Sequence, residues 1–224
     1  MKKIICAILS AFLLSSVVCS SDIKNKPVYS CNENIGNKIA LTFDDGPHPK
    51  ITPKILEVLD KYNVKATFFV IGINAKNYPE TLSMVANKGH QIGNHTYSHK
   101  SLKSISKDIV CKEISTAEDE IMQNDIEMTN ILRPPGGLYD QTLIDVALEK
   151  NYKIVLWNID THDWAHASDK AIIKNVINNV KGGDIILFHD YISGRANTIS
   201  ALEKLIPKLQ SMGYEFVTVS ELLQ

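Results

Sequence analysis

The sequence has no excess of charge of either sign. Its 224 residues include 24 Lys and Arg against 25 Asp and Glu, which gives a formal net charge of −1. It also has no block of basic residues. Because proteins that bind nucleic acid or an anionic membrane surface usually carry a basic patch, the composition predicts neither of these partners.

Long apolar runs, internal repeats, low-complexity tracts and inter-domain linkers are also missing. The main apolar run, residues 4–14, is too short for a comfortable membrane span. Hydrophobic residues nevertheless make up 44% of the chain, which is enough for one large domain with a full core. We therefore expect a single domain that acts as a monomer.

The N-terminus has the pattern of an export signal. Two lysines precede the apolar run and several serines follow it, so we expect residues 1–20 to be a secretory signal peptide that is removed, leaving no stable membrane insertion. Lipid attachment at Cys19 and an uncleaved anchor are the alternatives. Residues 21–37 are predicted to be a polar leader, and residues 38–224 the folded domain.

Cysteine is scarce: the chain has four, and Cys6 and Cys19 lie in the predicted signal. Export permits a disulfide between the remaining Cys31 and Cys111, and we expect one, with a reduced pair as the alternative.

The rest of the chain alternates between two patterns. Short apolar runs rich in Val, Ile and Phe predict buried strands at residues 39–43, 66–71, 91–93, 131–132, 153–157, 184–188 and 216–219. Segments of helical period predict helices at residues 51–62, 80–88, 105–124, 141–150, 170–180 and 199–211. This alternation predicts an α/β fold with a parallel sheet covered by helices, and about seven strand–helix units suit a barrel, complete or incomplete.

Clusters of polar residues follow the carboxyl ends of these strands, where active sites of barrels lie. They are Asp44-Asp45 and residues 95–99, 133–137, 160–164 and 189–190.

Two of these clusters have the composition of a metal site. A buried, unpaired carboxylate costs several kcal/mol, so Asp44 and Asp45 need a cation or a proton unless they form an acidic turn before the next helix. His95 and His99 are four residues apart, which on a helical turn places both imidazoles on one face, as two metal ligands or as two surface histidines. Asp45 would complete a set of two histidines and one carboxylate.

The other clusters supply a cation, an open backbone and a second histidine. Arg133 either lies on a rigid surface loop or orients a carboxylate such as Asp44. The glycines that begin at Gly136 allow a backbone N–H to approach a ligand closely. Asp163 either starts a helix or fixes the tautomer of a catalytic histidine. His189 is either a core histidine or a candidate general acid.

Together, these clusters resemble the NodB-homology polysaccharide deacetylases, carbohydrate esterase family 4. The runs that carry the resemblance are residues 42–47, 66–70, 93–99, 133–135, 160–164 and 187–189. The resemblance extends over about residues 38–224. It implies a deformed (β/α) barrel and metal-dependent removal of N- or O-acetyl groups from a polysaccharide.

The resemblance also implies a role for each matched residue. One divalent ion would be bound by Asp45, His95 and His99. We expect zinc, although cobalt, nickel or manganese suit the same geometry. Asp44 would be the general base, braced by Arg133, and His189 the general acid, braced by Asp163. The substrate and its oxyanion would contact the residues Gly136, Trp164 and Leu187. The family often has Tyr where this chain has Gly136, so the oxyanion contact would come from the backbone N–H.

The substrate expected from the resemblance is a cell-wall glycan, with N-acetylglucosamine of peptidoglycan as first choice. The enzyme would then be secreted or cell-wall associated. N-acetylmuramic acid, chitooligosaccharides, a biofilm glucosamine polymer and acetylxylan are alternatives. So are a non-catalytic glycan-binding protein on the same fold and an amidase for a small non-sugar amide.

Overall fold

The computed structural model describes residues 27–123, 126–191 and 197–224. The predicted signal peptide, with Cys19, lies outside the described residues. Within the described ranges, no helix is long and apolar enough to cross a membrane.

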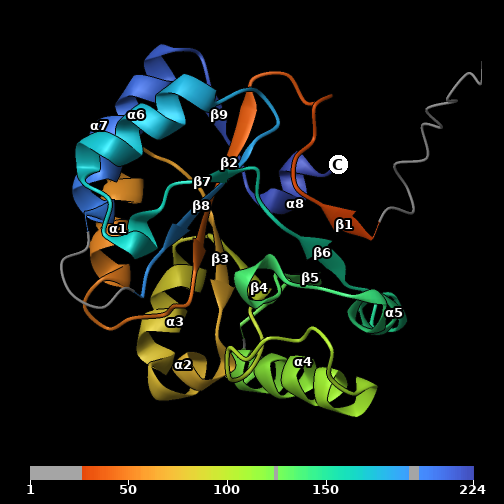
Figure 1. Cartoon of the computed structure of the whole chain (residues 1–224). Coiled ribbons are helices and arrows are strands. Elements are labelled where there is room, and N and C mark those ends of the chain that lie inside the picture. Colours follow the sequence, from red (N-terminus) through yellow and green to blue (C-terminus); the bar gives the residue numbers. More distant parts are fainter. Residues whose placement is uncertain (1–26, 124–125, 192–196) are drawn as a thin grey trace, which may run out of the picture.

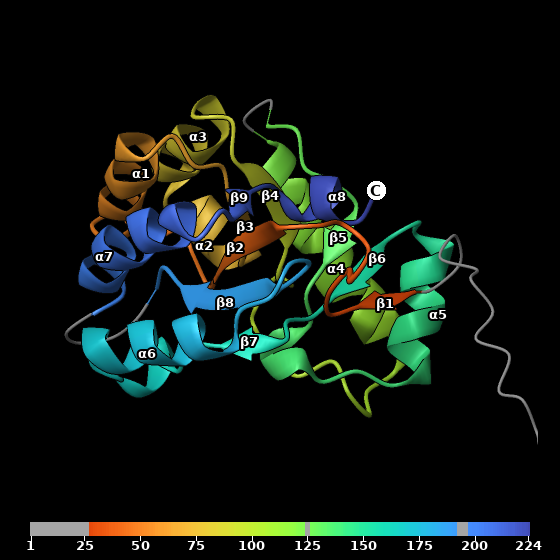
Figure 2. The same ribbon diagram turned by 90° about the horizontal axis from the view of Figure 1, so that it is seen from above.

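A curled parallel sheet forms the centre of the molecule (Figures 1 and 2). Its strands are β1 (Val28–Tyr29), β2 (Lys38–Asp44), β3 (Thr67–Val70), β4 (Gln91–Asn94), β5 (Ile131–Leu132), β6 (Lys153–Val155), β7 (Ile159–Asp160), β8 (Ile185–His189) and β9 (Glu215–Phe216). The strand order is β1-β6-β5-β4-β3-β2-β8-β7, and β9 pairs with β2. Strands β1 and β7 lie at the two ends of this order and do not pair with each other. The sheet of the described residues is therefore an incomplete, deformed (β/α) barrel. The predicted fold class is confirmed.

Helices lie between the strands and cover the sheet. They are α1 (Thr52–Lys61), α2 (Gly72–Asn77), α3 (Pro79–Asn87), α4 (Lys107–Met122), α5 (Gln141–Glu149), α6 (Asp169–Asn179), α7 (Thr198–Ser211) and α8 (Val219–Leu222). The six helices predicted from periodicity are all present, with ends within two residues of the prediction. Helices α1, α6 and α7 lie side by side on one side of the sheet (Figure 2).

The central strand β2 shows how the sheet places polar groups. Ile39, Leu41 and Phe43 belong to the core between the sheet and its helices. Ala40 belongs to a second cluster, with Phe69 and Val155. Because side chains alternate along a strand, Asp44 lies on the same inner face of the barrel as Ala40, at the carboxyl end of the strand.

Two parts of the sequence prediction are corrected by the sheet. Strand β1 pairs in parallel with β6, and the N–H of Asn32 donates to the carbonyl of Gly183 at 2.9 Å, so residues 28–32 of the expected leader belong to the fold. Near the C-terminus, the strand expected at residues 216–219 ends at Phe216. Thr218 then caps helix α8 by accepting from the N–H of Glu221. A two-residue strand in a polar segment, such as β1, shows no apolar pattern.

The expected disulfide is also wrong, because Cys31 and Cys111 are both free. Cys31 forms an isolated β-bridge with Asp184, beside the start of β8. Cys111 lies on α4 and packs against the hydrophobic cluster that includes Leu102 and Val110. The two thiols therefore belong to different parts of the fold, one beside the sheet and one on a helix.

Candidate active site

Arg133 and Asp44 join the ends of β5 and β2. The Nη1 of Arg133 donates to Oδ1 of Asp44 at 2.7 Å and to Oγ1 of Thr42 at 2.8 Å. Its Nε donates to the carbonyl of Val155 at 3.1 Å, and its Nη2 donates to the carbonyl of Leu156 at 2.9 Å. The Arg133 side chain is fully buried, so this network fixes the orientation of the Asp44 carboxylate.

The carboxylate of Asp45 and two imidazoles meet beside Asp44. Oδ1 of Asp45 lies 3.3 Å from Nε2 of His95 and 3.1 Å from Nε2 of His99. One ligand atom from each residue lies within 4.8 Å of the others, so the three form a group that could bind a metal. Asp45 has a left-handed φ of 76°, which turns the chain after β2 so that its carboxylate lies in the same pocket as that of Asp44.

The histidines are brought together by a loop and not by the helical turn that their spacing suggested. Strand β4 ends at Asn94, and the loop that follows has positive φ at Thr96 (66°) and His99 (57°). The N–H of His99 donates to Oγ1 of Thr96 at 3.2 Å, which stabilises this bend. The two imidazole centroids are 5.0 Å apart.

Hydrogen bonds around this group fit a cation. Nδ1 of His95 lies 2.7 Å from the carbonyl oxygen of Arg133, and since a carbonyl only accepts, Nδ1 carries the proton. Nε2 therefore directs its lone pair at Asp45, as a metal-ligating histidine requires. Oδ1 of Asp45 is buried and has no hydrogen-bond partner among the described residues. An unpaired buried carboxylate oxygen facing two imidazole nitrogens suits a divalent metal ion.

The same contacts shift the titration of this group. Burial favours the neutral form of Asp45, but the imidazoles of His95 and His99, which can donate to Oδ1 when they are protonated, outweigh it and hold the pKa of Asp45 well below its usual range. The same contact with Asp45 raises the pKa of His99, and burial opposes the change. The carboxylate therefore stays ionised, which is the form that binds a metal.

His189 ends β8 and contacts the buried carboxylate of Asp163. Its Nδ1 lies 2.8 Å from Oδ1 of Asp163, and its backbone N–H donates to Oδ2 at 2.9 Å. Asp163 also accepts from Oγ1 of Thr198 at 2.8 Å and from the N–H of Trp164 at 2.9 Å. Burial disfavours the charged imidazole, but the hydrogen bond that it donates to Asp163 and the charges of the nearby carboxylates prevail, which raises the pKa of His189 to about 9.

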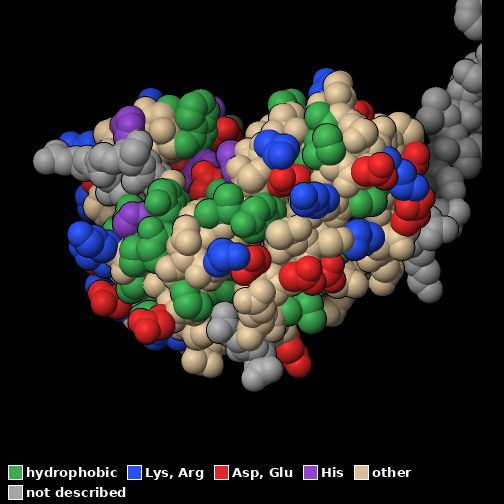
Figure 3. Space-filling model, turned by 90° about the horizontal axis from the view of Figure 1, so that it is seen from below, with side chains coloured by type: hydrophobic (Ala, Val, Ile, Leu, Met, Phe, Trp, Pro, Cys, Tyr) green, Lys and Arg blue, Asp and Glu red, His purple; other side chains and the backbone are tan. Residues whose placement is uncertain are grey.

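These groups open into one pocket of about 410 Å³. Its lining residues are Asp44, Asp45, His95, His99, Gly136, Trp157, Asp160, Trp164, Leu187 and His189. On the face where the strands end, histidine and acidic side chains gather in a hollow bordered by hydrophobic side chains (Figure 3). Every residue predicted for the site lies in the pocket or directly behind it, as Arg133 and Asp163 do. Gly136 has a left-handed φ of 63°, which favours glycine there.

Sequence reasoning gave no role to three other residues at the site. Trp157 and Asp160 line the pocket. Trp157 ends a predicted strand and Asp160 begins a polar cluster, but neither was given a role. Asp190 is buried behind it, where Oγ1 of Thr52 donates to its Oδ2 at 2.5 Å. Burial, together with the nearby negative charges, raises the pKa of Asp190 to about 7. In the sequence, only its position directly after His189 indicated that Asp190 lies near the site.

Known proteins resemble this chain in sequence and in fold. Residues 32–155 match the family model for polysaccharide deacetylase. The chain is 40% identical over 195 residues to a peptidoglycan-N-acetylglucosamine deacetylase of Bacillus cereus, covering 86% of this chain and 90% of the relative. It is 33% identical to a chitooligosaccharide deacetylase of a Bradyrhizobium species, covering 88% of this chain and 97% of the relative.

A solved structure of a related protein has the same fold. A peptidoglycan N-acetylglucosamine deacetylase superposes with a TM-score of 0.85 at 37% identity, covering 90% of this chain and 95% of that chain. The fold and these relatives define a carbohydrate deacetylase, a class of hydrolase. The chain belongs to the polysaccharide deacetylase family, carbohydrate esterase family 4.

Proposed function

We propose that this protein is a secreted or cell-wall-associated, divalent-metal-dependent enzyme that removes the acetyl group from N-acetylglucosamine residues of peptidoglycan. The observation that carries the proposal is that Asp44 and His189 line the same pocket as the Asp45, His95 and His99 group. The similarity to peptidoglycan-N-acetylglucosamine deacetylases supports the choice of substrate.

The metal would be held by Asp45, His95 and His99, with zinc as the first choice and cobalt, nickel or manganese as alternatives. When bound, it would act as a Lewis acid on the acetyl carbonyl and make water more acidic. The buried, unpaired Oδ1 of Asp45 and the outward lone pair of His95 Nε2 support this assignment.

Asp44 would be the general base. Arg133 occupies its Oδ1, and its Oδ2 lies on the side of His95, at 3.8 Å from Nε2. From there Oδ2 would take a proton from the water that attacks the acetyl carbon. The backbone N–H of Gly136, on the pocket wall, would donate to the oxyanion as it forms.

His189 would be the general acid. Because Nδ1 donates to Asp163, the Nε2–H is the group available to the substrate. With a pKa of about 9, the imidazole is protonated near neutral pH. Nε2 would give its proton to the departing amine nitrogen, so the products are acetate and a free glucosamine. Trp164, whose side chain is 53% exposed, and Leu187 would bound the sugar.

A chitooligosaccharide substrate is the second candidate, favoured by the similarity to the Bradyrhizobium enzyme. A non-catalytic glycan-binding protein is less well supported, because binding alone requires neither the braced carboxylate Asp44 nor the Asp163–His189 pair.

Acetate release tests the proposal. The purified protein would be incubated with peptidoglycan, chitooligosaccharides and acetylxylan, with and without a chelator. We expect the fastest release from peptidoglycan, loss of release with chelator, and recovery when zinc is added back. Release unaffected by chelator would overturn the metal assignment. Binding without acetate release, in protein saturated with metal, would overturn the enzymatic one.

A further inference from the structure

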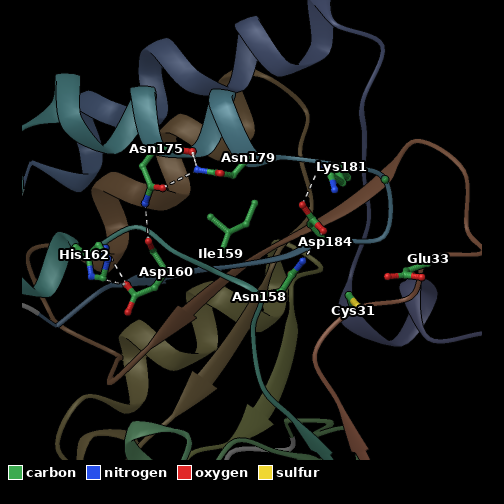
Figure 4. A pocket seen from close by; sticks show the side chains of 11 residues that line it. Cys31, Glu33, Asn158, Ile159, Asp160, His162, Asn175, Asn179, Lys181 and Asp184 are labelled. Atoms are coloured by element: carbon green, nitrogen blue, oxygen red, sulfur yellow. Dashed lines mark hydrogen bonds and ion pairs between the residues drawn. The ribbon is translucent and has the colours of Figure 1, made fainter.

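A second hollow, of about 710 Å³, lies between β7 and α6 (Figure 4). Strand β7 ends the strand order, and no strand of the described residues lies beside its outer edge. The lining is polar: it includes the amides of Asn175 and Asn179 on α6, the ammonium of Lys181 and the imidazole of His162. We call this hollow the β7–α6 groove. The reaction proposed above uses none of these four side chains.

Asp160 lines both the β7–α6 groove and the active-site pocket, so the two cavities adjoin at this residue. Three contacts hold this junction in place. The N–H of His162 donates to Oδ1 of Asp160 at 2.8 Å, and Nε1 of Trp164 lies 3.3 Å from the same oxygen. Nδ2 of Asn175 donates to the carbonyl of Asp160 at 2.7 Å. The position of Asp160 at the junction of the two cavities is therefore fixed before any substrate binds.

The chemistry of the groove suits a neutral, hydroxyl-rich chain. Nδ2 of Asn179 donates to Oδ1 of Asn175 at 3.0 Å, which aligns two amides one helical turn apart. Among the described residues, the lysines that form ion pairs do not include Lys181. The buried carboxylate of Asp184 already accepts from Asn158 and from the N–H of Lys181 at 2.7 Å. Both donors and acceptors thus face the groove, the carboxylates of Glu33 and Asp160 among the acceptors.

We propose that the β7–α6 groove binds sugar residues of the same polysaccharide chain, next to the residue in the active-site pocket. The inference rests on the proposed function. A polymeric substrate has to continue beyond a 410 Å³ pocket, and this groove is the hollow that shares a wall with it. A peptide attached to the glycan is the other possible occupant, and the experiment separates the two.

Chitooligosaccharides of two to six residues, which carry no peptide, are the probe. The test variant is Asn179→Ala combined with Lys181→Ala. The matched control is Asn178→Ala combined with Lys174→Ala, which removes one amide and one ammonium from exposed positions of α6 outside the groove. The quantity measured is the ratio of kcat/KM for the hexamer to kcat/KM for the dimer.

In the wild type and the control, we expect this ratio to be well above one. In the test variant it should fall by about 10-fold, through KM, since two hydrogen bonds to substrate are lost. An unchanged ratio in the test variant would overturn the proposal. An unchanged ratio on oligosaccharides together with slower turnover of peptide-bearing fragments would assign the groove to peptide instead.

Failure of the proposed function is recognised separately, because no oligomer would then release acetate. Binding is therefore also measured by calorimetry with the hexamer, in Asp44→Asn protein to prevent turnover. The groove substitutions should weaken hexamer binding by about the same 10-fold. Equal binding with and without them would overturn the subsite whether or not the protein is an enzyme.

Discussion

Nη1 of Arg133 donates to Oδ1 of Asp44 at 2.7 Å in a site that excludes solvent. The two residues are 89 positions apart, at the ends of β5 and β2. A cation buried without its partner would be costly, so this pair stabilises the fold and orients the carboxylate at once. Under the proposed function, catalysis and stability are therefore coupled at this contact.

The first prediction follows from that coupling. Arg133→Lys should lower the free energy of unfolding by about 3–5 kcal/mol, because an ammonium cannot reach the carbonyls of Val155 and Leu156 as well as Asp44. Urea denaturation measures it. The control, Lys107→Ala, removes an exposed ion pair with Glu149 and should change stability little. An equal loss of unfolding free energy in the two variants would contradict a stabilising role for the buried Arg133 network.

The second prediction concerns the metal. Purified protein should contain about one divalent ion, and His95→Ala and His99→Ala should each lose most of it, because each removes one of three ligands. Elemental analysis after dialysis measures the content. His166→Asn, at an exposed position outside the pocket, is the control and should retain the ion. Full occupancy in both alanine variants would refute the assignment.

The third prediction separates the two adjacent carboxylates. Asp44→Asn should abolish turnover while the metal stays bound, because its Oδ1 is engaged by Arg133 and not by the histidines. Asp45→Asn should weaken metal binding, since Oδ1 of Asp45 faces both Nε2 atoms. Metal affinity and acetate release are measured on the same preparations. If Asp44→Asn emptied the site and Asp45→Asn did not, the roles would be reversed.

The fourth prediction concerns the pH dependence set by His189. Its folded-state pKa of about 9 lies above the ordinary value of 6.5, so the contact with Asp163 favours the imidazolium. Asp163→Asn should lower this pKa and move the alkaline limb of the rate profile to lower pH. His189→Ala should slow amide hydrolysis by about two to four orders of magnitude with the metal retained. An alkaline limb that does not move in Asp163→Asn would rule out this pairing.

The same shift has a consequence for stability. Because the pKa of His189 is raised on folding, its contribution is fully present below pH 6.5 and is lost as the pH rises through about 9. The free energy of unfolding of the wild type should therefore fall over that window more steeply than that of His189→Gln. Parallel curves would show that this contact carries no stability.

The fifth prediction concerns the turn after the acidic pair. A Cβ on Gly46 would lie 2.1 Å from a carboxylate oxygen of Asp190, so Gly46→Ala should destabilise the protein by steric overlap. Asp190→Ala removes the opposing atoms. The loss of stability in the double variant should therefore be smaller than the sum of the two single losses, as urea denaturation of all four proteins can measure. Simple additivity would contradict the contact.

Much of this protein was predictable from local pattern. The six long helices, the strands on either side of them and the five polar clusters depend on residues close together in the chain, where periodicity and turn chemistry act directly. The residues of the candidate site were found for the same reason: each cluster follows a strand, and the carboxyl ends of parallel strands meet on one face.

The tertiary structure decided the rest. Whether β1 joins the sheet, whether Cys31 meets Cys111, and which nitrogen of His95 faces Asp45 all depend on contacts between distant segments. The same holds for the loop that brings His95 to His99. A left-handed turn, or a two-residue strand in a polar segment such as β1, has no apolar pattern of its own, and only hydrogen bonds to the rest of the barrel select it.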